Sequence, residues 1–229
     1  MLWYKGWLET RFRLLFVLGF GAFFVFLATH TGNSALTPGQ RLVNGLSTYW
    51  WAAAVMLAGA GIKTQAAFQA TKGLHGSVYF TLSLPVSRLR LLATRAGLGM
   101  LETVAVIAGA VSTVWLVFPG LRAGLAVWDA LEYVLVAAIC VSACYSLSAL
   151  LATFLDDMWQ FWGSFIAIFF LRWLSEAFRV PPSLNVFRAM GLSSTLFTHT
   201  LPWACMGISL GAAAILFFAA VKVVQLREY

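Results

Sequence analysis

The chain has 229 residues, of which 61% are hydrophobic and only 10% are charged. Soluble domains are typically about 45–50% apolar and about 25% charged, so this composition excludes an ordinary soluble protein. The net charge of +7 comes without a basic patch on a soluble fold, so we assign the cations to membrane orientation and exclude a nucleic-acid partner.

The first expected element is a helix that lies in the membrane interface. Residues 1–13 mix aromatic side chains such as Trp3 and Trp7 with cations such as Lys5 and Arg11. This mixture favours a helix that lies along the interface rather than one that crosses the bilayer. A plain juxtamembrane tail is the alternative interpretation.

The remainder of the chain is dominated by apolar segments of membrane length. A helix needs about 20 apolar residues to cross a bilayer. We therefore predict an all-α membrane protein in which residues 1–229 form a single transmembrane domain. The six expected spans lie at about 13–30, 46–63, 92–118, 130–154, 158–175 and 201–224.

The distribution of cations predicts the orientation. With six spans both termini lie on one side, and that side carries ten of the 15 lysines and arginines. The positive-inside rule then places both termini in the cytoplasm and the protein in the cell (inner) membrane. Tryptophans near the ends of spans are expected at the interface, namely Trp50, Trp51, Trp115, Trp128, Trp159, Trp162, Trp173 and Trp203.

No catalytic or metal-binding pattern is present in the sequence. It contains neither the phosphate loop Gly-x-x-x-x-Gly-Lys-Ser/Thr nor the zinc motif His-Glu-x-x-His. The three cysteines lie inside apolar runs, where packing is a better interpretation than a disulfide or a metal site. We therefore expect no active site, metal or cofactor in this chain.

One carboxylate, Glu102, lies well inside an expected span. An ionisable group at mid-bilayer costs about 2.5–3.5 kcal/mol on insertion scales, so Glu102 should face protein or water. Two roles are open. Glu102 belongs to a transport path or gate, or it packs and forms a hydrogen bond between helices.

Small residues recur at four-residue spacing on two expected spans. Ala54, Ala58 and Gly61 mark the second span, and Ala105 and Gly109 mark the third. Such spacing lets helix backbones approach closely. It is compatible with packing inside one bundle and with packing between two copies.

The long inner connection between the second and third spans contains a semi-polar segment. Leu74, Val78 and Leu82 recur every four residues and can form one docking face of a short helix. Pro85 ends that helix near residue 84, because proline disfavours helical geometry in the residue before it. Ser87 is then placed to cap the next helix.

These features together resemble the permease subunit of a type-2 ABC exporter, the ABC-2 family. The motif that carries the resemblance is LSLPVSRLRLL at residues 82–92, at the start of the third span. The layout matches over nearly the whole chain. It comprises an elbow helix at 1–13, a cytoplasmic coupling helix at 74–84 and a re-entrant outer helical segment at 175–200.

The resemblance implies a role for each part of the inner segment. The residues that couple the permease to an ATPase would be Leu74, Val78, Tyr79, Phe80, Thr81 and Leu82. The start of the next helix would be formed by Pro85, Ser87 and Arg88.

The resemblance also implies the partners and the energy source. A separate ABC ATPase subunit would bind ATP and Mg²⁺, and a second permease copy or a paralogue would complete the complex. Movement of the ATPase dimer would pass through the coupling helix into the spans and export a hydrophobic or amphipathic substrate.

Two other functional classes are open. A stand-alone secondary transporter or channel would need ionisable groups in the membrane, for which Glu102 is the candidate. A membrane scaffold without transport activity is the third class. The identity of the cargo is not encoded in the apolar spans, because such side chains also suit plain lipid contact.

Overall fold

The structure is a computed structural model that describes residues 2–30, 38–58, 88–117, 126–155, 157–191 and 200–226. Every regular element within these residues is helical, which confirms the all-α class for the described part of the chain. The helices, with their bounds, are α1 (Leu2–His30), α2 (Pro38–Ala58), α5 (Arg88–Val117), α7 (Val127–Ala152), α8 (Asp157–Ala177), α9 (Val186–Ala189) and α11 (Trp203–Leu226).

Three of these helices are long and apolar enough to cross a membrane. They comprise Leu92–Val117 within α5, Val127–Ala152 and Trp203–Leu226, each longer than the roughly 20 residues that a crossing needs. A shorter apolar stretch, Arg13–Leu27, lies within α1. The described chain therefore has the character of a helical membrane protein.

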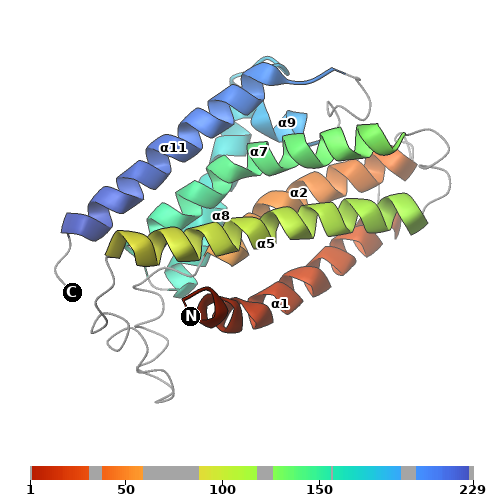
Figure 1. Ribbon diagram of the computed structural model, residues 1–229. Helices are drawn as coiled ribbons and strands as arrows, with labels where there is room; N and C mark the ends of the chain where they lie inside the picture. The colour runs from red at the N-terminus through yellow and green to blue at the C-terminus, as the bar shows by residue number, and fades with distance from the viewer. Residues whose placement is uncertain are drawn as a thin grey trace.

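The bounds of two helices differ from the expected spans. α2 begins at Pro38, eight positions before the expected start at 46. The expected start lies at the beginning of the apolar run, whereas the helix already includes the polar residues that precede this run. Proline is favoured at the first helical position, where its missing N–H needs no partner. α1 includes the expected elbow and the first span in one helix, whose first turns point in a different direction from the rest (Figure 1).

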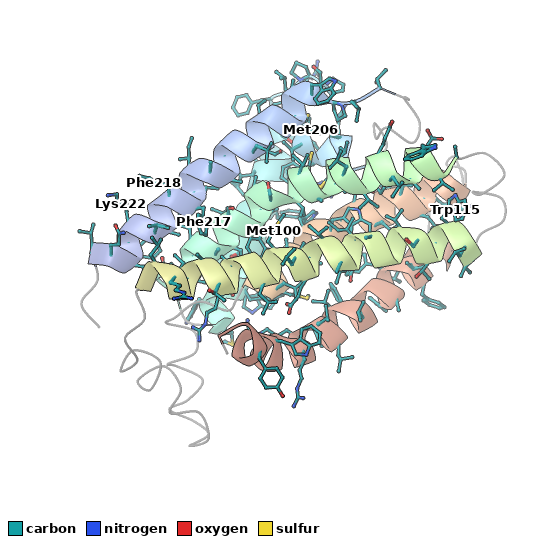
Figure 2. The ribbon with its side chains drawn as sticks, in the orientation of Figure 1. Met100, Trp115, Met206, Phe217, Phe218 and Lys222 are labelled. Carbon is teal, nitrogen blue, oxygen red and sulfur yellow. The ribbon has the colours of Figure 1, made fainter. Side chains whose placement is uncertain are left out.

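The long helices lie side by side, with α7 at the centre (Figure 1). α7 packs against α2, α5, α8, α9 and α11, whereas α1 packs against α2 and α5. The start of α1, the start of α5 and the end of α11 lie at one end of this bundle, and α9 lies at the opposite end. Lys222 and Trp115 mark these two ends (Figure 2).

α2 lies in the interior of the bundle. Tyr49, Trp50 and Trp51 are at most 2% exposed, and each belongs to the central apolar cluster. Trp50 and Trp51, expected at the end of a span, instead lie well inside α2 and pack in the core, because α2 starts earlier than expected. Trp128, Trp159, Trp173 and Trp203 are exposed.

The small residues of the two spans have different environments. Ala54 and Ala58 on α2 are buried inside the bundle. Ala105 and Gly109 on α5 are exposed, and a Cβ added to Gly109 would meet no atom within 4 Å. The α2 pair thus serves packing within this chain, whereas the α5 pair faces outward.

α1 and α2 approach closely at a glycine. The Tyr49 hydroxyl donates a hydrogen bond to the backbone carbonyl of Val17 at 2.8 Å. A Cβ on Gly21, one turn further along α1, would lie 2.6 Å from Cζ of Tyr49. Gly21 is therefore needed for the end of the Tyr49 ring to approach α1 this closely.

Candidate functional site

The expected ATPase-coupling residues lie outside the described part of the chain. This applies to Leu74, Val78, Tyr79, Phe80, Thr81 and Leu82, and also to Pro85 and Ser87. The structure describes the helices on both sides: α2 runs to Ala58 and α5 begins at Arg88. Arg88, the third residue of the expected helix start, lies in α5.

The two helices that flank residues 59–87 both approach α7 near Tyr145. The hydroxyl of Tyr145, on α7, donates a hydrogen bond to the backbone carbonyl of Ala96 on α5 at 2.9 Å. A Cβ on Gly99 would clash with the Tyr145 hydroxyl and would lie 3.0 Å from the carbonyl oxygen of Leu57 on α2. We call Tyr145, Gly99 and these two carbonyls the inner clamp.

Two ionisable side chains are buried next to the inner clamp. Arg95 and Glu102 on α5 are 6% and 5% exposed. They are seven residues apart, which is about two helical turns, so they lie on the same face of α5 as Gly99. Glu102 thus lies near the middle of α5 and faces the interior of this chain.

A polar cluster joins α8 to α2 and α7. The Nε2 group of Gln160 on α8 donates hydrogen bonds to Oγ of Ser148 on α7 and, at 3.4 Å, to the carbonyl of Val55 on α2. Oγ of Ser148 lies 3.0 Å from Oγ of Ser164. All three polar side chains are at most 2% exposed. Each therefore satisfies its hydrogen-bonding needs inside the bundle instead of in lipid.

At the α9 end, α8 terminates in a Schellman motif. The N–H of Val180 donates to the carbonyl of Ser175 at 3.0 Å, and the N–H of Arg179 donates to that of Glu176 at 3.0 Å. Arg179 therefore has a φ of 49°, a left-handed conformation that usually belongs to glycine. The motif reverses the chain direction directly before Pro181.

The described part of the expected outer segment, residues 175–191 and 200, packs onto the bundle. Asn185 caps α9 by accepting from the N–H groups of Phe187 and Arg188, and its Nδ2 donates to Oγ of Ser175 on α8 at 3.2 Å. Met190 is fully buried and Ala189 is 2% exposed. The segment thus returns from the end of α8 into the core.

A chain of hydrogen bonds holds this buried turn. Nε1 of Trp50 on α2 donates to the hydroxyl of Tyr133 on α7 at 2.9 Å. That hydroxyl donates to the carbonyl of Met190, also at 2.9 Å. At the same end, Nη1 of Arg172 on α8 donates to Oγ1 of Thr48 on α2 at 3.2 Å.

Within the described residues, no group of three or more histidine, cysteine, aspartate or glutamate side chains is arranged to hold a metal ion. Cys140, Cys144 and Cys205 are buried as free thiols, and Cys205 Sγ contacts the carbonyl of Ser183 at 3.1 Å. No family model, curated protein or solved structure matches this chain.

The sequence interpretation missed the residues that join the helices. Tyr145, Gly99 and Gln160 each lie inside or beside an apolar run without belonging to a motif. A usable signal was present, because a polar side chain within a span must find a partner in protein. The identity of that partner depends on how the helices pack.

Proposed function

We propose that this chain is the transmembrane permease subunit of an ATP-driven transporter of the type-2 ABC exporter class. It has no ATP-binding motif of its own, and a separate ATPase subunit supplies the energy. Its substrate is a hydrophobic or amphipathic compound, and a second permease copy or a paralogue completes the complex. The protein lies in the cell membrane with both termini in the cytoplasm.

One observation carries the proposal: the arrangement of the two ends of the bundle. The start of α1, the start of α5 and the end of α11 lie at one end, and α9 lies at the other (Figure 1). This arrangement fits six crossings, with residues 59–87 on the cytoplasmic side and the returning outer segment on the opposite side. It supports the assignment of residues 74–84 as the coupling helix.

The first test is association with an ATPase. The chain is coexpressed with the ATPase subunit from a neighbouring gene, purified through a tag on the permease, and assayed for ATP hydrolysis. We expect copurification and stimulated hydrolysis, and we expect Leu82→Asp to abolish both. A permease that never associates with such a subunit contradicts the proposal.

We assign Glu102 to packing between α5 and α7. Its burial inside a single copy of the chain, on the same face of α5 as Gly99, supports this role over a place on a transport path. Glu102→Gln keeps the size and the hydrogen-bonding capacity of the side chain, so ATP-driven transport should persist in this variant.

A stand-alone secondary transporter is the second candidate, and one observation favours it. Arg95 and Glu102 are both ionisable groups buried in a candidate span, where such groups commonly serve ion coupling. Transport that persists without the ATPase, collapses with the proton gradient and is lost in Glu102→Gln would favour this candidate.

A further inference from the structure

The inner clamp joins the two helices that flank residues 59–87. Leu57 is the last residue but one of α2, and Ala96 and Gly99 lie near the beginning of α5. The absence of a side chain at Gly99 lets the α5 backbone approach the carbonyl of Leu57. The same gap accommodates the Tyr145 hydroxyl, which is hydrogen-bonded to Ala96 and 4% exposed.

This geometry restricts how the two helices can move. Separating α2 from α5 would expose the Leu57 carbonyl that lies close to Gly99. Moving α5 away from α7 would break the hydrogen bond from Tyr145 to Ala96. In an apolar environment a broken hydrogen bond of this kind leaves a polar group without a substitute from water. A displacement of residues 59–87 is therefore carried into α7 instead of separating α2 from α5.

We propose that Tyr145 is a positioning residue that makes the inner ends of α2, α5 and α7 move as one unit. From α7 the movement reaches α11, which packs along it. The role in transport rests on the proposed function, because it requires an ATPase that displaces residues 59–87. The mechanical link between the three helices holds with or without that partner.

The chain supplies a matched control for this proposal. Tyr49 is also a buried tyrosine whose hydroxyl donates to a backbone carbonyl, that of Val17, beside a glycine on the neighbouring helix, Gly21. Its contact joins α1 to α2 and does not involve α5 or α7. Tyr49→Phe and Tyr145→Phe thus remove the same chemical group from two different helix pairs.

The first experiment uses the purified permease alone and measures backbone hydrogen–deuterium exchange. Loss of one hydrogen bond between membrane helices should raise exchange about threefold at residues 92–100 in Tyr145→Phe. Tyr49→Phe should leave that segment at its wild-type rate and raise exchange in α1. Unchanged exchange at 92–100 in Tyr145→Phe overturns the proposed link.

The second experiment uses the reconstituted complex and measures the amount of substrate transported per ATP hydrolysed. Tyr145→Phe should lower this ratio about threefold, because the variant loses the same interhelical hydrogen bond as in the first experiment. ATP hydrolysis should stay near the wild-type rate. If Tyr145 only stabilised the fold, its loss would lower transport and ATP hydrolysis together and leave the ratio unchanged. An unchanged ratio overturns the role of Tyr145 in transmission.

The two experiments separate this inference from the proposed function. If no ATPase associates with the chain, the proposed function fails, whereas the exchange measurement still decides whether Tyr145 links the three helices. If the complex forms and the exchange at 92–100 is unaffected by Tyr145→Phe, the link fails and the proposed function stands.

Discussion

Gly21 and Gly99 set how closely α1 approaches α2 and how closely α5 approaches α7 and α2. Each lies where a tyrosine hydroxyl from a neighbouring helix reaches a backbone carbonyl, Val17 in one case and Ala96 in the other. A glycine in a helix is ordinarily destabilising because of its conformational freedom. Here the missing side chain is what allows the tyrosine to reach the backbone.

The variant Gly99→Ala should destabilise the protein by about 1–3 kcal/mol, the usual cost of overpacking a filled interior. The added Cβ would clash with the Tyr145 hydroxyl, which is held by its hydrogen bond to Ala96, and would crowd the Leu57 carbonyl, which belongs to the backbone. Thermal unfolding in detergent measures the effect. Gly109→Ala is the control, because its Cβ would meet open space; equal unfolding temperatures for the two variants would contradict the close approach.

A second prediction concerns the left-handed residue at the end of α8. Arg179→Gly should stabilise the protein by about 0.5–1 kcal/mol, because glycine adopts a positive φ without the steric cost of a Cβ. The unfolding midpoint measures the gain. Arg179→Ala removes the same charge and keeps the Cβ, so it should show no gain; a similar gain in both variants would assign the effect to charge instead.

At the scale of elements, α8 is attached to the bundle by polar contacts near both of its ends. Gln160 and Ser164 join the cluster around Ser148. At the other end Arg172 contacts Thr48 on α2. Much of the surface between these contacts is apolar and exposed, including Trp162, Ile166 and Phe169. Lipid does not favour the association of apolar surfaces as water does, so these polar contacts carry much of the specificity of α8 docking.

The variant Ser148→Ala should therefore loosen α8. It removes a hydroxyl that contacts Gln160 and Ser164, and the expected cost is about 0.6 kcal/mol, with about 1.7 kcal/mol as an upper value for one such bond. Hydrogen exchange in 157–177 should rise while exchange in 203–226 stays unchanged. Ser142→Ala is the matched control, since Ser142 donates to Ile139 in its own helix. Equal exchange in both variants would exclude a docking role for Ser148.

At the scale of the whole molecule, the direction of the helices places the start of α1 and the end of α11 together, and the turn around α9 opposite them. α5, α7 and α11 each run the length of the bundle, so the α9 end and the terminal end are separated by whole spans (Figure 1). In a membrane these two ends would face different compartments. Exposed residues at each end make this separation measurable.

Phe178→Cys and Leu226→Cys should react with an impermeant maleimide from opposite sides of the membrane. Phe178 is 74% exposed next to the outer turn, and Leu226 is 82% exposed at the end of α11. We expect labelling of Phe178→Cys in intact cells and of Leu226→Cys only after lysis. The native cysteines are buried and provide a low background. Labelling of both variants from the same side would refute the orientation.

The all-α class and the approximate course of the membrane-length segments follow from the sequence alone. In lipid the backbone must form its hydrogen bonds internally, so long apolar segments form helices. Four expected spans have a helix at closely similar positions, namely α5, α7, α8 and α11.

The packing of the helices was decided by the tertiary structure. In a soluble protein an apolar face indicates the core, but in a membrane both lipid and neighbouring helices accept apolar side chains, so periodicity does not separate them. Sequence spacing therefore could not distinguish the buried Ala54 from the exposed Ala105, or identify Trp50 as a core residue. The partners of Tyr145 and Gln160 are likewise set by contacts between segments far apart in the chain, which no local pattern encodes.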